Sequence, residues 1–308
     1  VCSSDLISIY PTIYHEFQCK ADQCENTCCQ LWTIDIDEPT AERYHSMTGS
    51  LGESLRQAIT VDDEGSHFIF SKTQPMCPLL NEKGLCKVVL ELGEEGLCDT
   101  CHMHPRFYKY IEDLELCGVG LSCEASVELL ARQEPMDLLL FTIEDDHNEF
   151  NSEERLTLHN VFELLAFDLD PNLFQYTPKP SKQSFKELLD LYKQTEPIDE
   201  NWTAQVNTLS NKLDQLIASV QTYIQHEDMS LFNKVYQYIL YRQIDMLSDY
   251  SLESILAYAK DGTDYILIAS ALEGQPLKQI ARWSQQIEYD EDNVALLLQH
   301  YEAQLIIE

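Results

Sequence analysis

The chain has 308 residues, and its content of 44% hydrophobic and 24% charged residues is ordinary for a folded globular protein, which excludes global disorder. The 53 Asp and Glu residues against 20 Lys and Arg give a formal net charge of −33, which argues against nucleic acid and anionic membranes as partners. This acidity either keeps the protein in solution or attracts a cationic substrate.

The length predicts two domains, and the cysteines indicate where they meet. All eleven cysteines lie at or before Cys123. We therefore expect a cysteine-rich metal-binding domain over residues 7–123 and a helical domain over residues 124–308. The predicted fold is mainly α, with a small irregular N-terminal domain packed on an all-α C-terminal domain. Residues 1–6, which include Cys2, resemble a translated sequencing adapter, so we treat them as non-native.

The N-terminal part shows few regular patterns. Residues 40–76 look irregular, apart from a short helix that Pro39 can start and that reaches Tyr44. Residues 67–70 predict a brief strand. The sequence Asn-Glu-Lys-Gly at residues 81–84 is typical of a tight turn, and this turn would bring Cys77 and Cys86 together.

The C-terminal part shows apolar residues three and four positions apart, which is the helical period. Ser181 is a good N-cap, and Gly262 and Gly274 predict breaks between helices. The predicted helices lie near residues 124–135, 152–168, 182–194, 201–226, 230–247, 251–260, 263–272, 276–286 and 291–306.

The chain has no run of 18 apolar residues, and it does not open with a charged region followed by an apolar stretch. We therefore expect no transmembrane segment and a cytoplasmic location. In such a compartment disulfides are disfavoured, and the odd number of cysteines also argues against them. Inert buried thiols are common, but eleven of them within 123 residues would be far too dense. Metal ligation remains, by zinc or by an iron–sulfur cluster.

The spacing of the cysteines supports metal binding. Cys24 and Cys28 can bind one centre, and so can Cys98 and Cys101. Cys28 and Cys29 point apart as neighbours, so they would serve two irons of one cluster or two separate centres. An iron–sulfur cluster is favoured over zinc, because the ligands are nearly all sulfur and too many for one tetrahedral ion. Three histidines are expected at the surface or outside the ligand shell: His15, His102 and His104.

Several motifs resemble those of the flagellin lysine-N-methylase family, a group of cysteine-cluster proteins described as zinc- or iron-chelating. They are Phe17-Gln18-Cys19-x4-Cys24-x3-Cys28-Cys29-x2-Trp32, Cys77-Pro78-Leu79-Leu80 with Gly84-Leu85-Cys86-Lys87, Leu92-Gly93 with Cys101-x3-Pro105-Arg106, Leu121-Ser122-Cys123, and residues 283–289 with 291–293. The cysteine motifs are specific, whereas the helical motif near the C-terminus is weak.

The resemblance implies methyl transfer to flagellin lysines, with S-adenosylmethionine as the donor and a [4Fe-4S] cluster, or zinc as the alternative. It implies eight metal ligands, which are Cys19, Cys24, Cys28, Cys29, Cys77, Cys86, Cys101 and Cys123. Cys98 and Cys117 do not match the motifs, although spacing alone pairs Cys98 with Cys101. Eight thiolates are twice what one [4Fe-4S] cluster needs, so either some are not ligands or there are two centres.

The donor site follows no pattern that the sequence reveals. A glycine-rich turn after a strand is absent, and so is the C-x3-C-x2-C spacing of radical S-adenosylmethionine enzymes. Arg106 can pair a carboxylate, either of the protein or of the donor. Tyr14, Tyr108 and Tyr110 are candidate bases for the substrate amine, or packing residues. A non-catalytic metal-binding protein, structural or redox-sensing, is the alternative function.

Overall fold

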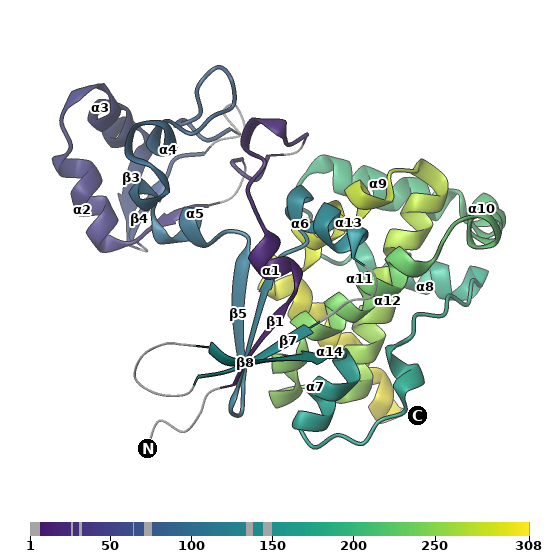
Figure 1. Cartoon of the computed structure of the whole chain (residues 1–308). Helices are drawn as coiled ribbons and strands as arrows, with labels where there is room; N and C mark the ends of the chain where they lie inside the picture. Colours follow the sequence, from purple (N-terminus) through teal and green to yellow (C-terminus); the bar gives the residue numbers. More distant parts are fainter. Residues whose placement is uncertain are drawn as a thin grey trace. The chain divides into compact units, whose positions relative to one another are not determined.

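The computed structural model describes residues 7–25, 27–30, 33–63, 65–70, 76–133, 138–143 and 150–307. The predicted non-native residues 1–6 and Trp32 of the first motif lie outside them. The chain forms two compact units (Figure 1). Residues 18–107 form what we call the cysteine unit, and residues up to Phe17 together with those from Tyr108 onward form the helical unit. These bounds differ from the predicted 7–123 and 124–308.

The cysteine unit contains more regular structure than the sequence suggested. A three-stranded sheet has the order β2-β4-β3, and both pairings are antiparallel. The strands are β2 (Asp35–Ile36), β3 (Ile59–Asp62) and β4 (Gly65–Phe68). The helices are α2 (Glu38–Ser46), α3 (Gly49–Ala58), α4 (Lys87–Leu92) and α5 (Asp99–Met103), with short 3-10 turns η1 (Ala21–Gln23) and η2 (Glu94–Gly96).

The expectation of an irregular segment at 40–76 is therefore wrong for its described residues. The short helix predicted from Pro39 forms as α2, and α3 follows it directly. The predicted strand forms as β4, displaced by two residues at each end. Glycines and polar residues weaken the helical pattern of α3, but Leu51 and Leu55 are buried in the core of the unit. Their burial supplies stability that the propensity of α3 does not.

The helical unit is mostly helical but contains a five-stranded sheet with the order β5-β6-β1-β7-β8. The strands are β1 (Ile7–Pro11), β5 (Arg106–Ile111), β6 (Leu114–Val119), β7 (Leu138–Ile143) and β8 (Phe150–Leu156). The boundary between the two units falls within β5, after Phe107. β1 pairs in parallel with β6 and antiparallel with β7. The prediction of an all-α C-terminal domain is thus wrong, because β7 and β8 lie inside it.

The misjudged strands have a physical explanation. β7 is a short apolar run, which periodicity alone does not distinguish from a helix. It becomes a strand because β1, far away in the sequence, offers its backbone hydrogen bonds. β8 then pairs with β7, so the predicted helix at 152–168 is reduced to the seven residues of α7 (Leu158–Leu164).

The short helix α1 (Ile13–Glu16) was not predicted. The other helices agree with the predictions in place but not always in extent. They are α6 (Glu124–Arg132), α8 (Lys182–Tyr192), α9 (Glu200–Asn211), α10 (Leu213–His226), α11 (Ser230–Arg242), α12 (Leu252–Glu273), α13 (Pro276–Ile287) and α14 (Glu291–Ile307), with 3-10 turns η3 (Pro171–Phe174) and η4 (Ile244–Ser248). Ser181 is the N-cap of α8, as predicted. The predicted helix 201–226 is divided at Lys212.

Gly262 does not break a helix, because α12 passes through it without interruption. A Cβ atom at this position would lie 2.4 Å from Cζ2 of Trp283, which is fully buried. The missing side chain lets α13 pack closely on α12, so the glycine serves packing rather than flexibility.

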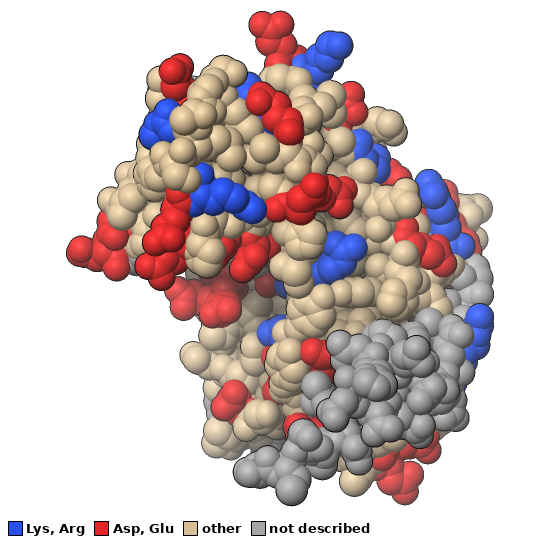
Figure 2. All heavy atoms as spheres, turned by 60° about the vertical axis from the view of Figure 1, so that its left-hand side comes forward, with Lys and Arg blue, Asp and Glu red and all other residues tan. Residues whose placement is uncertain are grey.

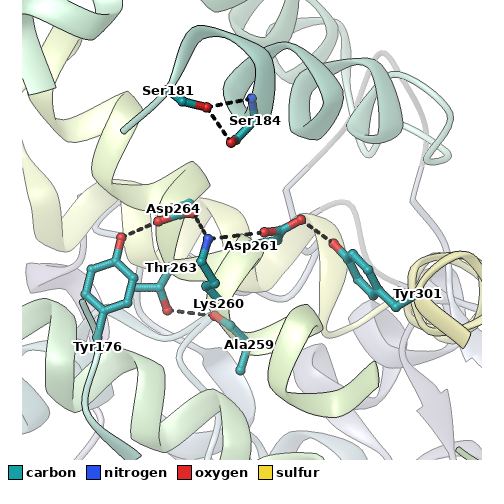
Figure 3. Close-up of polar contacts among 9 residues, drawn as sticks. All are labelled: Tyr176, Ser181, Ser184, Ala259, Lys260, Asp261, Thr263, Asp264 and Tyr301. Carbon is teal, nitrogen blue, oxygen red and sulfur yellow. Dashed lines mark hydrogen bonds and ion pairs between the residues drawn. The ribbon is translucent and has the colours of Figure 1, made fainter. Parts of the chain in front are cut away.

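A polar network lies inside the helical unit (Figure 3). Nζ of Lys260 is 2.5 Å from Oδ2 of Asp264 and 3.8 Å from Oδ1 of Asp261. Tyr176 donates to Oδ1 of Asp264 (2.5 Å) and Tyr301 to Oδ2 of Asp261 (2.9 Å). The network joins α12 to α14 and to the segment after η3, and each carboxylate has partners of its own.

None of the described helices combines the length and apolarity that crossing a membrane requires.

Candidate functional site

Five thiols come together in the cysteine unit. Cys77, Cys86, Cys98 and Cys101 contact the same buried core, which the side chains of β2, β4, α2 and α3 form. Cys29 joins them through its backbone, because its carbonyl oxygen accepts a hydrogen bond from the amide of Cys77 (2.9 Å). Four separate stretches of sequence thus deliver thiols to one region, which we call the thiol cluster.

The turn between Cys77 and Cys86 forms as predicted. Oδ1 of Asn81 accepts hydrogen bonds from the amides of Lys83 (2.8 Å) and Leu85 (3.0 Å). Gly84 has a φ of +76°, a conformation that favours glycine. The turn folds the chain back, so that Leu80 pairs with Cys86 across an isolated antiparallel bridge.

Hydrogen bonds from α2 hold the residues that directly precede Cys98. The guanidinium of Arg43 on α2 donates to the carbonyl oxygens of residues 95–97. The hydroxyl of Tyr44 donates to Gly96 (2.7 Å) and is buried there. Cys98 itself is fully buried, so its sulfur has little freedom to move.

On the following side, Asp37 fixes the start of α5. Its Oδ1 accepts a hydrogen bond from the amide of Asp99 (2.9 Å), while Oδ2 accepts from the amide of Thr40 and caps α2. Desolvation opposes ionisation, but these hydrogen bonds hold the pKa of Asp37 below its usual value. Sequence reasoning missed this residue, although an aspartate two positions before Pro39 is a typical N-cap signal.

The thiols affect one another's ionisation. A hydrogen bond from Cys101 lowers the pKa of Cys98, and the same pairing, together with burial and nearby thiolates, raises that of Cys101 far above its usual range. The Cys28 thiol lowers the pKa of Cys29 to about 6, with further help from Thr27. The spacing of Cys98 and Cys101 therefore indicated a real contact.

Cys77 and Cys86 ionise less readily. Burial raises the pKa of Cys77 to about 12, and negative charge on Cys29, Cys86 and Cys98 adds to the effect. Burial also raises the pKa of Cys86, with contributions from Cys29 and Cys98. The simultaneous ionisation of several thiols in this region is unfavourable unless a cation lies among them.

The donor set fits a thiophilic metal. Backbone amides donate to the sulfurs, from Val88 and Val89 to Cys86 and from Leu79 to Cys77. Such hydrogen bonds are the usual environment of metal-bound thiolates. Within the described residues, however, no three His, Cys, Asp or Glu side chains stand in a geometry ready for an ion. Metal binding would therefore have to draw the sulfurs closer, as is common when binding and folding are linked.

The remaining predicted ligands lie elsewhere. Cys19 is exposed, and its sulfur accepts a hydrogen bond from the amide of Ala21 (3.4 Å); Cys24 and Cys28 are half-buried. Cys123 belongs to the helical unit, where it is the N-cap residue of α6. Cys117, also in the helical unit, is fully buried on β6.

The other candidate residues are less closely tied to the thiols. Arg106 is half-buried at the start of β5. His15 and His102 are exposed, and His104 is half-buried. None of these belongs to a group of three possible ligands among the residues described.

The surface carries the acidity that the composition predicts. Figure 2 shows one face on which red Asp and Glu side chains gather in several patches, with blue Lys and Arg side chains between them. Such a surface attracts cationic molecules at low ionic strength, and added salt weakens this attraction.

Comparison with known proteins gives two kinds of result. No protein-family model matches the chain, and no solved structure does. Among curated proteins, 139 residues are 27% identical to the lysine-N-methylase of Salmonella typhimurium, covering 43% of this chain and 35% of that protein. The lysine-N-methylase of Salmonella choleraesuis matches equally. The flagellar biosynthetic protein FliU of Salmonella muenchen is 27% identical over 118 residues, which cover 37% of this chain and 70% of FliU.

The match thus spans about a third of the length of the curated lysine-N-methylases. It supports a relationship to a methylase and to a protein of flagellar biosynthesis, at low identity and over less than half of this chain.

Proposed function

We propose that the protein is a protein-lysine N-methyltransferase that acts on flagellin, with S-adenosylmethionine as donor and a [4Fe-4S] cluster bound by cysteines. The similarity to lysine-N-methylases and FliU supports the reaction and the substrate. The observation that carries the metal is the thiol cluster, because Cys77, Cys86, Cys98 and Cys101 contact one core and the backbone of Cys29 is hydrogen-bonded to that of Cys77. The proposed location is the cytoplasm, where thiols stay reduced.

The chain's residues would contribute to the metal site in distinct ways. The four proposed ligands are the cysteines that belong to both the predicted set and the thiol cluster, which are Cys29, Cys77, Cys86 and Cys101. The amides that donate to Cys77 and Cys86 would stabilise their thiolates. When bound, the cluster supplies cross-links between short elements and a one-electron redox couple.

Methyl transfer places its own demand on the protein. The bond between the methyl carbon and the donor sulfonium breaks as the carbon–nitrogen bond forms, and S-adenosylhomocysteine leaves. The lysine must first lose a proton, because an ammonium has no lone pair. A base and a partly desolvated site provide that neutral amine. Arg106 remains the proposed partner of the donor carboxylate.

The test is a methylation assay on the full chain. The protein is purified without oxygen, its iron, sulfide and zinc are measured, and flagellin with S-adenosylmethionine is added. We expect iron and sulfide in equal amounts and flagellin lysines that are about 14 mass units heavier for each methyl group added. Cys86→Ser should lose iron and activity, whereas Cys117→Ser, a buried thiol of the other unit, should keep both.

The outcomes separate the alternatives. Metal without methylation would support a non-catalytic, structural or redox-sensing protein. Zinc without sulfide would replace the iron–sulfur cluster with a zinc site. Methylation that persists in the metal-free protein would leave the metal with no part in the reaction.

A further inference from the structure

One face of the sheet in the helical unit carries polar and aromatic side chains in adjacent positions. Side chains alternate along a strand, so Tyr108 and Tyr110 of β5 share a face. Ser8 of β1 lies directly opposite Glu115 of β6 in the parallel register. Tyr10 follows Ser8 on the same face, so three neighbouring strands contribute to one surface.

Glu115 lies at the centre of this surface. One carboxylate oxygen accepts a hydrogen bond from the hydroxyl of Ser8 (2.6 Å), and the other accepts from that of Tyr110 (2.8 Å). Lys109 points away from this face and pairs with Asp245 (2.9 Å). Within the described part of the chain, no lysine or arginine pairs with Glu115. A half-buried carboxylate is thus held in position by neutral donors and lacks a cation.

Aromatic rings form one side of the same surface. Tyr14 of α1 stands between two other tyrosines, edge-on to both. Its ring centroid is 4.8 Å from that of Tyr10 and 6.4 Å from that of Tyr108. The hydroxyls of Tyr14 and Tyr108 are 2.5 Å apart and share a hydrogen bond. Burial raises the pKa of Tyr10 well above its usual value, so this ring stays neutral.

We propose that Glu115 and the rings of Tyr14, Tyr108 and Tyr110 bind the side-chain ammonium of the substrate lysine, with the buried Tyr10 ring supporting Tyr14 from behind. The inference rests on the proposed methyltransferase function and names the group that the site receives. An ammonium offers three donors and needs acceptors, which the carboxylate and the tyrosine hydroxyls supply. Aromatic faces attract cations and also pack against the four methylenes of a lysine stem.

The chemistry of this surface also suits the product. Each added methyl group removes an N–H donor and adds apolar surface, while the positive charge remains. The contact with Glu115 should therefore weaken with methylation, whereas the contact with the tyrosine rings should persist. The acidic surface of the protein guides a cationic chain toward such a site.

The test measures binding without methyl transfer. The probe is Nα-acetyl-lysine methylamide, titrated into the full metal-loaded chain with no donor present and followed by NMR shifts. The uncharged norleucine analogue is the matched ligand. We expect Glu115→Gln to weaken binding about fivefold, the loss of one partly exposed charge pair. Tyr108→Leu should weaken it about threefold, by removing a ring.

The control variant is Tyr301→Phe. It removes the hydrogen bond from Tyr301 to Asp261, another hydroxyl–carboxylate pair of the helical unit, and both residues are far in the sequence from those of this surface. It should bind the probe as the unchanged protein does. Hydrogen-exchange protection of β5 and β6 shows whether each variant keeps its fold. If Glu115→Gln loses hydrogen-exchange protection, the binding of the probe by Tyr108→Leu decides whether this surface is the lysine site.

Two results would overturn the inference: unchanged binding in a folded Glu115→Gln or Tyr108→Leu variant, or equal binding of the norleucine analogue. These differ from a failure of the proposed function. Glu115-dependent lysine binding without methylation would keep the site and reject the methyltransferase. Methylation with an unchanged KM in Glu115→Gln would keep the methyltransferase and reject the site.

Discussion

The cysteine unit and the helical unit differ in what surrounds their buried polar groups. In the helical unit several buried groups pair with other protein groups: the hydroxyl of Tyr241 lies 2.7 Å from the carbonyl oxygen of Cys117, and Nε1 of Trp283 donates to Tyr192 (3.0 Å). In the cysteine unit the thiols mainly face other thiols, and burial with nearby thiolates opposes the ionisation of Cys77.

The difference indicates what each unit requires. A core of aromatic rings and long helices is stable by its own packing. The cysteine unit has short helices and strands of two to four residues. The small core that such elements enclose rarely supplies enough stability by itself. We therefore expect the helical unit to fold without metal and the cysteine unit to depend on it.

Metal removal should have the largest effect. Chelation of the full chain should abolish the hydrogen-exchange protection of residues 18–107 and leave that of the helical unit intact. Structural metal sites of this type contribute on the order of 10 kcal/mol, because binding energy is folding energy. Exchange measured by mass spectrometry with and without chelator tests this. Equal loss of protection in both units would contradict the comparison.

The second prediction concerns two fully buried cysteines, one in each unit. Cys98→Ser should lower metal affinity at least about tenfold, because Cys98 contacts Cys101 inside the thiol cluster. Cys117→Ser should bind metal as the unchanged protein does. Metal per chain, measured after dialysis against a graded competitor, provides the readout. Normal metal affinity in Cys98→Ser would show that Cys98 does not contribute to metal binding.

A third prediction tests the packing of the helical unit. Gly262→Ala should lower the free energy of unfolding by about 1–2 kcal/mol, because overpacking against Trp283 exceeds the roughly 1 kcal/mol gained from helix propensity. Urea denaturation measures the loss. In a double-mutant cycle with Trp283→Phe, which has a smaller ring, the two effects should be non-additive. Additive effects would mean that the close approach is not the cause.

The smallest effect concerns Asp261 and depends on pH. Burial raises its pKa from 3.8 to about 6, although Lys260 acts in the opposite direction. Below pH 3.8 both states are protonated; as the pH rises toward 6, the unfolded chain ionises first. The unfolding free energy should therefore fall over this window by about 2 kcal/mol or less.

Asp261→Asn should lack this pH-dependent loss, because the amide does not titrate, and its Oδ1 can still accept the hydrogen bond from Tyr301. Denaturation at several pH values between 4 and 7 gives the slope. The control is Asp214→Asn, an exposed carboxylate paired with Lys182, which should keep the slope of the unchanged protein. A slope that survives in Asp261→Asn would assign the pH dependence to another group.

The sequence predicted local features well. The turn over residues 81–84, the N-cap at Ser181 and most helices depend on residues close in the chain, so their patterns can be read directly. The pairing of Cys98 with Cys101 belongs to the same class, because two positions three apart meet on one helical turn. The motif resemblance, which omits Cys98, did not include this contact.

What the sequence could not determine depends on partners far away in the chain. β7 is a strand because β1 pairs with it, and Gly262 continues a helix because Trp283 needs its space. The surface around Glu115 exists only because β1, β5 and β6 are neighbours in one sheet. By itself the sequence determined that the cysteines gather near the N-terminus and that helices dominate the rest. Only the tertiary structure decided which thiols meet, because burial and backbone pairing, rather than spacing, bring distant segments together.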